Sequence, residues 1–205
     1  MKNNFSILLM AVLFCSSHVS HAQSVLVVEP GIGTLNNAIN TYGGTKIYQL
    51  KAGEWYQLTA VIQNLGYHLQ IVGQEPTIKG GLPATLQTGN AATGGAFGVM
   101  FDAKSDITLR NIYLVNSDLN SVVGTSLLSN SGSNARTVID RCIIDPVSSG
   151  NAITMSGANS KLYFTNNLCN RQGHQLNPND GHFFVDDNLS GAGFDTIIDD
   201  IYNYA

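Results

Sequence analysis

A single pattern of eight residues occurs four times in the second half of the chain. In each copy, residues alternate between apolar and polar for about four positions, and a polar or Asn-like residue takes the fifth. The alternation then resumes one residue out of phase. Alternation predicts a strand with one buried face, and Asn or Asp at the phase shift favours the left-handed conformation of a tight corner. The copies are 107–114, 137–144, 162–169 and 196–203.

The spacing of the copies leaves no room for crossover helices. Positions 109, 139, 164 and 198 are 30, 25 and 34 residues apart, which is the range of solenoid repeats. A further short apolar segment precedes each copy. Three short strands per period predict a parallel β-solenoid whose rungs stack roughly 4.8 Å apart. The preceding segments are 99–101, 127–128, 153–155 and 183–185.

Aligning the copies predicts four inward columns of mostly apolar side chains: 107/137/162/196, 109/139/164/198, 112/142/167/201 and 114/144/169/203. Cys142 and Cys169 fall in different columns of neighbouring rungs, so their side chains lie on a diagonal of about 7 Å. That distance is too long for an unstrained disulfide. We expect two buried thiols, and the spacing of the cysteines does not resemble a zinc site.

The N-terminal part of the chain predicts a leader and a capping helix. Residues 1–22 carry Lys2, an apolar core and a small-residue cleavage site, which is typical of a signal peptide and predicts export. Thr34 is expected to cap a short amphipathic helix over 35–40, which would cover the open end of the first coil.

Strands are expected at 46–50, 54–58 and 67–73, with Gly73 at a corner. Residues 80–95 show no periodicity and are interpreted as an inserted loop.

Several segments carry a resemblance to a known family. They are Gly33 to Ile39, Tyr48 to Tyr56, Leu69 to Gly73, Leu162 to Asn167, Asn177 to Phe184 and Asp195 to Ile198. They resemble right-handed parallel β-helix proteins of the pectate lyase/pectinesterase-like superfamily, in the form exported by Bacteroidetes-type bacteria. The resemblance implies an all-β, right-handed parallel β-helix of about four to five coils over residues 23–205. The chain departs from the family pattern in having few coils and no C-terminal cap. We therefore expect either that the chain is truncated or that another element covers the C-terminal end of the solenoid.

The composition limits the classes of partner. Charged residues make up 12% of the chain and the formal net charge is -4, which argues against nucleic acid or an anionic membrane as partner. The apolar part of the leader is too short to span a bilayer. By resemblance, the expected partner is an acidic polysaccharide along an outward face.

An outward column of the repeat holds the first candidate site. Arg110, Asp140 and Asp199 occupy equivalent positions, and Arg110 and Asp140 would lie roughly 5 Å apart on successive rungs. By resemblance, lyases of this kind neutralise the uronate carboxylate with calcium held by Asp and Glu, and use Arg or Lys to take the proton beside that carboxylate. Arg110, Asp140 and Asp199 are therefore the candidate catalytic residues. The alternative is an ordinary ladder of surface ion pairs of low energetic value.

A second candidate lies between two later coils. Asp180, Asp186 and Asp187 lie in an oxygen-rich segment that could hold calcium, although Asn-Pro and Asp-Gly pairs are also ordinary turn chemistry. A third outward column is unexpectedly apolar, and it would either stack sugar rings or be covered by loop 80–95 or 170–180. It consists of Tyr113, Ile143, Leu168 and Tyr202.

These patterns leave the function open between two classes. One is a pectate-lyase-like protein that acts on or binds an acidic glycan, with calcium as the one cofactor considered. The other is a non-catalytic carbohydrate-binding or surface-adhesion module. A trimeric phage-type fibre is a third reading, against which the export leader argues.

Overall fold

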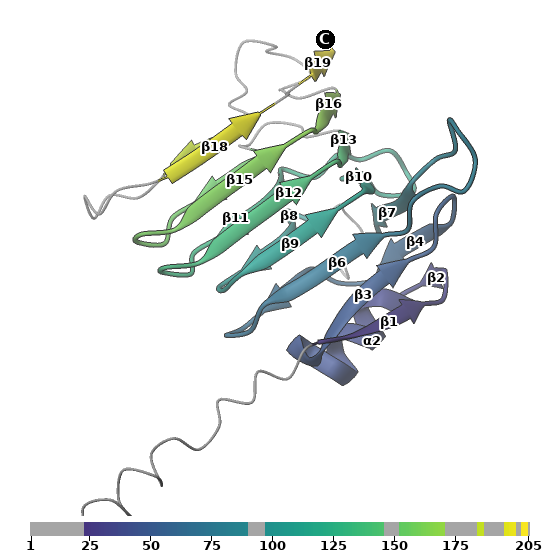
Figure 1. The fold of residues 1–205 in the computed structure, drawn as a ribbon, viewed down its shortest axis with the longest axis horizontal. Helices are drawn as coiled ribbons and strands as arrows, with labels where there is room; N and C mark the ends of the chain where they lie inside the picture. Colours follow the sequence, from purple (N-terminus) through teal and green to yellow (C-terminus); the bar gives the residue numbers. More distant parts are fainter. Residues whose placement is uncertain are drawn as a thin grey trace, which may run out of the picture.

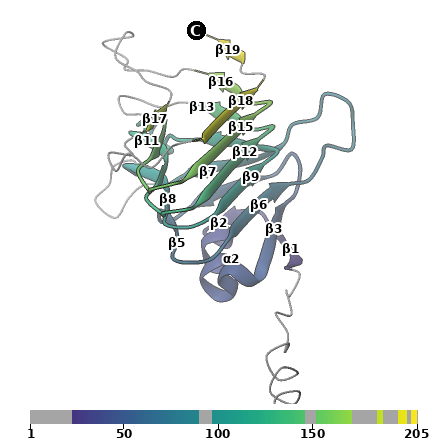
Figure 2. The ribbon, with the colours of Figure 1, turned by 60° about the vertical axis from the view of Figure 1, so that its left-hand side comes forward.

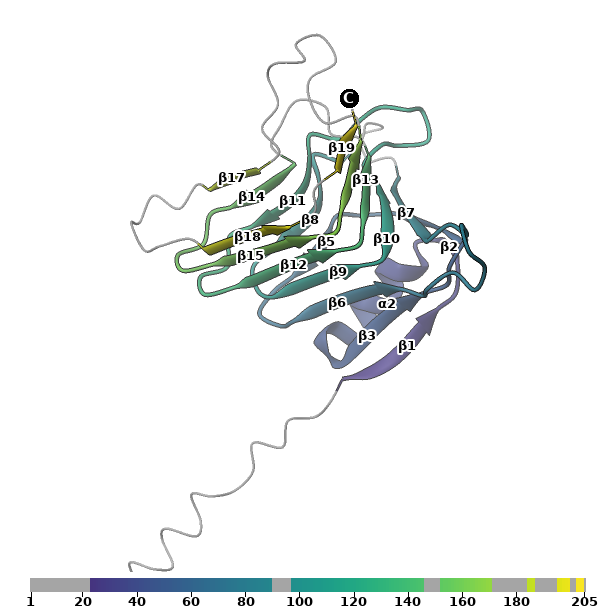
Figure 3. The same ribbon diagram turned by 45° about the horizontal axis from the view of Figure 1, so that its top comes forward.

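The computed structural model describes residues 23–89, 97–145 and 152–170, together with the backbone of three strands between residues 184 and 204. The predicted leader, 1–22, lies outside the described residues. The described part of the chain contains nineteen strands in three sheets that wind around one interior, in a right-handed parallel β-helix of about five coils (Figures 1 and 3). The predicted fold class is confirmed.

Five coils contribute one strand to each sheet, and the first and last described coils contribute strands to sheets A and B only. Sheet A contains, in spatial order, β1 (Ser24–Val28), β3 (Lys46–Leu50), β6 (Leu69–Gly73), β9 (Ile107–Arg110), β12 (Arg136–Asp140), β15 (Lys161–Thr165) and β18 (Asp195–Asp199). Sheet B contains β2 (Gly31–Ile32), β4 (Trp55–Leu58), β7 (Ala84–Thr88), β10 (Ile112–Val115), β13 (Ile143–Asp145), β16 (Leu168–Asn170) and β19 (Tyr202–Tyr204). Sheet C contains β5 (Ile62–Asn64), β8 (Val99–Ala103), β11 (Ser126–Asn130), β14 (Ile153–Met155) and β17 (Phe184–Asp186).

The strand register confirms the predicted columns. Leu109 pairs with Ile139, which pairs with Phe164 on the next rung, and Phe164 pairs with Ile198. The first three of these side chains are completely buried. Leu114, Ile144 and Cys169 stack in the same way in sheet B. The copies found by sequence alignment therefore lie directly above one another.

Each repeat corner between sheets A and B, from β9 to β16, contains one residue in the left-handed region. Asn111, Arg141 and Asn166 have φ values of 54°, 53° and 55°, as the phase shift predicts. Asn pays little for this conformation, whereas Arg is rarely found in it. Gly73 occupies the equivalent place one rung earlier, but its φ is not positive. A Cβ atom there would lie 2.0 Å from the Asn111 carbonyl oxygen, so Gly73 is needed for close approach.

Buried asparagines tie each rung to the next. The Asn167 amide accepts a hydrogen bond from the Cys142 N–H and donates one to the Ile139 carbonyl, at 2.8 Å each. Asn64 makes the same kind of contact in sheet C, where it accepts from the Lys104 N–H and donates to the Asp106 carbonyl. These amides satisfy backbone groups that leave the strand ladders at the corners, which would otherwise be costly to bury.

A helix covers the N-terminal end of the interior, as predicted. Helix α2 (Thr34–Tyr42) is followed by the short 3-10 helix η1 (Gly43–Thr45), and α2 buries Leu35 and Ile39 against the first coil (Figure 2). The predicted cap was wrong. The N-cap is Gly33 with φ 69°, and Thr34 is the first helical residue. Among the described residues, no helix has the length and apolar character to cross a bilayer.

The interpretation of 80–95 as an inserted loop was also wrong. Residues 84–88 form strand β7, which pairs with β4 and β10 in sheet B. Ala84, Leu86 and Thr88 point inward and are completely buried. The alternation was missed because alanine and threonine give little hydropathy contrast. Residues 90–96 lie outside the described part.

Cys142 and Cys169 are both buried and form no disulfide. Burial raises the pKa of each thiol to about 12. Both thiols therefore remain protonated and act as small apolar side chains of the interior, as the register predicted.

Replacing Asn167 with Ala tests the role of the corner amides. The change leaves the Cys142 N–H and Ile139 carbonyl buried without partners, and we expect a loss of about 1–3 kcal/mol in the free energy of unfolding. Denaturant titration measures this loss. The control Asn37→Ala alters an exposed helical residue and should stay within about 0.5 kcal/mol of wild type. Equal stability of the two variants would contradict this role.

Candidate functional site

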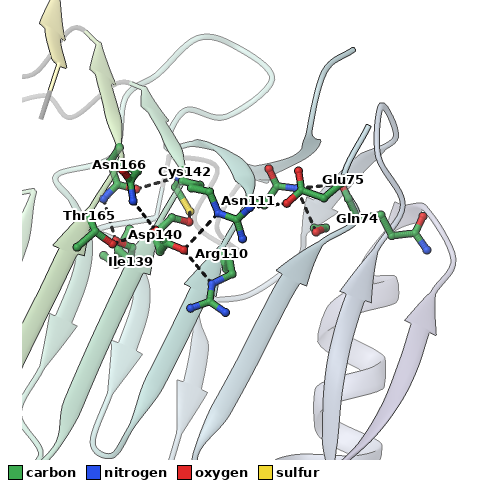
Figure 4. Close-up of polar contacts among 12 residues, drawn as sticks. Gln74, Glu75, Arg110, Asn111, Ile139, Asp140, Cys142, Thr165 and Asn166 are labelled. Atoms are coloured by element: carbon green, nitrogen blue, oxygen red, sulfur yellow. Dashed lines mark hydrogen bonds and ion pairs between the residues drawn. The ribbon is translucent and has the colours of Figure 1, made fainter. Parts of the chain in front are cut away.

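Arg110 and Asp140 form the predicted pair on the outer face of sheet A. Strands β9 and β12 place them side by side in register, and the Arg110 Nε donates to Asp140 Oδ2 at 3.0 Å (Figure 4). The Arg110 side chain is 43% exposed, whereas that of Asp140 is only 15% exposed. The carboxylate thus lies at the base of the pair and the guanidinium reaches the surface.

Four side-chain donors surround the Asp140 carboxylate. Oδ2 accepts from the Nε atoms of Arg110 and Arg141, and Oδ1 accepts from Thr165 Oγ1 at 2.9 Å and Asn166 Nδ2 at 3.1 Å. Burial of Asp140 opposes its ionisation. The hydrogen bonds from Asn166, Thr165 and Arg141, together with the charge of Arg110, outweigh burial and lower the pKa of this carboxyl below its usual value. Asp140 is a fixed anion at neutral pH.

A second arginine extends the network across the corner of sheets A and B. Arg141 also donates from Nη1 to Glu75 Oε1 at 2.6 Å. Glu75 lies just beyond β6, in the segment that crosses to sheet B two rungs earlier. Between these rungs, the Asn111 amide donates to the carbonyls of Gly73 and Gln74 (Figure 4). The network therefore spans four consecutive rungs, from the β6 rung with Glu75 to the β15 rung with Thr165 and Asn166.

The other predicted site residues are only partly placed. Asp199 pairs with Thr165 in register, so it continues the Arg110 and Asp140 column, although only its backbone is described. Asp186 lies in β17, also described by backbone alone, and Asp180 and Asp187 lie outside the described residues. The calcium prediction at Asp180, Asp186 and Asp187 therefore stays a prediction. No group of three or more His, Cys, Asp or Glu side chains that could hold a metal occurs within the described part of the chain.

The apolar column of sheet B proves to be longer than predicted. Tyr113, Ile143 and Leu168 are joined in register by Thr85 and Trp55. Residues 84–88 belong to this column as strand β7, so they cannot be the segment that covers it. Trp55 is 37% exposed, and its Nε1 donates to Gln87 Oε1 at 2.9 Å. Segment 170–180 lies almost entirely outside the described residues.

Sequence reasoning missed the part of the network contributed by Glu75 and Asn166. Glu75 is 66 residues from Arg141, and the strand expected at 67–73, with Gly73 at its corner, ends before Glu75. Asn166 was assigned to a corner, but its contact with Asp140 depends on where the corner side chain turns. Asn166 and Arg141 are the corner residues of successive repeat copies. The stacking of these corner positions is the signal that could have placed Asn166 beside Arg141.

Comparisons with known proteins support the architecture. No family model matches the chain, and no curated protein matches it. A solved structure of a PL6 family alginate lyase, AlyGC, superimposes with a TM-score of 0.53 at 14% sequence identity. The match covers 89% of this chain and 29% of the lyase chain.

This chain has a β-helix polysaccharide lyase-like fold. The structural likeness carries no residue roles at this identity, and the chain spans less than a third of the length of the lyase it matches. Any function of this β-helix has to be argued from its own side chains.

Substituting Asp140 with Asn tests the charge of the network. A pKa that is lower in the folded state contributes stability above the unfolded value of about 3.9, and this contribution is lost as the pH falls through the folded value. We therefore expect the difference in Tm between wild type and Asp140→Asn to be largest at neutral pH and to shrink below about pH 4. Thermal unfolding followed from pH 7 to pH 2.5 measures it.

The matched control for this experiment is Asp102→Asn. Asp102 accepts a hydrogen bond from Gln63 on the outer face of sheet C at 3.0 Å. Its substitution should give a smaller difference in Tm at every pH. Parallel wild-type and Asp140→Asn curves across the whole range would contradict the charged role of Asp140.

Proposed function

We propose that this β-helix is an exported protein that recognises an acidic glycan through the outer face of sheet A, with Arg110 as the group that binds a uronate carboxylate. The fold likeness to an alginate lyase supports a polysaccharide partner, and the leader pattern at 1–22 supports export. The observation that carries the proposal is the way in which Asp140 holds Arg110.

Asp140 orients the Arg110 guanidinium without occupying its two Nη donors. The contact uses Nε of Arg110, and within the described residues the two Nη atoms make no hydrogen bond. A guanidinium fixed at Nε presents its Nη donors in a planar fork, which suits a carboxylate. Because Asp140 is neutralised by Arg141 as well as by Arg110, it repels an incoming anion only weakly.

The same geometry favours binding over catalysis. A lyase needs a base that is free to take a proton beside the substrate carboxylate. Both oxygens of Asp140 are occupied by donors and its pKa is lowered, so it is a poor base. Asp140 is thus a positioning residue for Arg110, and a non-catalytic recognition module is the better reading of these contacts.

The affinity of purified protein for oligosaccharides tests this function. We expect binding to one of alginate, pectate or chondroitin oligomers, with little binding to a neutral glucan. Arg110→Ala should weaken binding at least about tenfold, because a hydrogen-bonded charge pair contributes about 1.5–3 kcal/mol. Arg110→Lys should fall between wild type and Arg110→Ala, since it keeps the charge and loses the fork. Isothermal titration calorimetry at two salt concentrations measures these affinities.

The control Arg136→Ala removes another arginine at the start of β12, whose contact with Asp106 is a loose 3.9 Å. It should bind nearly as wild type. Absorbance from unsaturated ends is followed in parallel, with and without calcium. Equal affinity for acidic and neutral glycans would refute the proposal. Release of unsaturated ends that Arg110→Ala abolishes would replace recognition with lyase activity.

A further inference from the structure

The corner residue Arg141 departs from the pattern of its neighbours. The equivalent corners one coil before and one coil after are Asn111 and Asn166, and all three residues have φ between 53° and 55°. Asn tolerates this left-handed conformation because its short side chain can bond the local backbone, whereas Arg has no such compensation. A strained position held by an unfavourable residue indicates that the side chain itself has a role.

The three corner side chains reach toward the N-terminal end of the solenoid. Asn111 and Asn166 donate to oxygen atoms of the rung before their own. Arg141 is longer and reaches two rungs back, where its Nη1 donates to Glu75 Oε1 at 2.6 Å. Its Nε also donates to Asp140 Oδ2 at 3.3 Å. Arg141 therefore contacts two carboxylates.

These two carboxylates differ in how firmly they are held. Asp140 is 15% exposed and accepts hydrogen bonds from four side chains. Glu75 is 65% exposed and lies beyond the end of β6, and within the described residues Arg141 is its one side-chain partner. An exposed ion pair contributes little to stability. Another carboxylate can therefore replace Glu75 at low cost.

Arg141 and Arg110 form a pair of neighbouring cations. Their Nε atoms lie 3.3 Å and 3.0 Å from the same oxygen, Oδ2 of Asp140, and both side chains are more than 40% exposed. A polyuronate carries one carboxylate on each sugar residue. A chain whose carboxylate is bound by Arg110 can therefore bring a second carboxylate to Arg141.

We propose that Arg141 is a second carboxylate-binding residue and that Glu75 occupies it until a polyuronate displaces the Glu75 side chain. This inference rests on the proposed recognition through Arg110. The displacement exchanges one carboxylate for another, so the charge balance around Arg141 is the same in the free and bound states. Glu75 is thus an internal competitor that disfavours ligands with a single carboxylate.

The central variant is Glu75→Gln, which keeps the size of the side chain and removes its charge. Isothermal titration calorimetry on the full chain uses the alginate or pectate hexamer that wild type binds more tightly. We expect the variant to bind about two- to fivefold more tightly, because the competing carboxylate is lost. Its affinity should also fall more steeply with salt, because binding then forms a new ion pair instead of exchanging one.

Arg141→Asn tests whether this gain passes through Arg141. Asn is the residue of the two neighbouring corners and suits the left-handed backbone, so we expect this variant to fold. It should bind the hexamer at least about threefold more weakly than wild type. Adding Glu75→Gln to it should bring little further gain. An equal gain in the two backgrounds would be a general charge effect and would overturn the inference.

The matched control is Glu29→Gln. Glu29 pairs with Lys51 at 2.6 Å and is 75% exposed, so its substitution removes an exposed ion pair of the same length and the same charge in the first coil. Its affinity should equal that of wild type, and a gain as large as that of Glu75→Gln would contradict the inference.

The two proposals fail in different ways. If Glu75→Gln binds no more tightly than wild type while Arg110→Ala still weakens binding, the displacement of Glu75 is refuted and recognition through Arg110 stands. If wild type and Glu75→Gln bind neither hexamer, both proposals are refuted for polyuronates.

Discussion

Hydrogen bonding between successive rungs is the constraint on which this β-helix depends. Within the strands it is supplied by parallel backbone ladders, and at the corners it passes to buried side-chain amides such as Asn64 and Asn167. Each rung can bury its apolar side chains only if the rung below is in register. An amide that bonds the backbone of the neighbouring rung therefore fixes the register at the point where the strand ladder is interrupted.

The same stacking explains the geometry of the Asp140 network. A residue on the outer face of sheet A has neighbours one rung before and one rung after, so a single carboxylate can meet an arginine on one side and a hydroxyl on the other. The corner adds Arg141 and Asn166 from the adjoining positions. One partly buried anion thereby orients two arginines, and the regular stacking of rungs produces a locally dense ion-pair cluster.

The repeat made much of this fold predictable, because period-two alternation and the left-handed corner leave strong marks in the sequence. The columns through Leu109, Ile139 and Phe164 and the pairing of Arg110 with Asp140 were predicted from them. Strand β7 was not, because Ala84 and Thr88 are buried without being strongly hydrophobic. The contact of Glu75 with Arg141 was also beyond sequence reasoning, since it depends on where an irregular segment returns to the sheets.

The corners differ in how much chain they contain. One or two residues join sheets A and B in three successive coils, from β9 to β16, whereas ten residues separate β10 from β11 and seven separate β13 from β14. In these three coils the differences in repeat length thus collect between sheets B and C, while the corner between sheets A and B keeps one residue with positive φ. Peptides grafted between sheets B and C would be displayed at intervals of one rung without altering the interior, so the molecule offers a ruler-like scaffold for arranging ligands along a line.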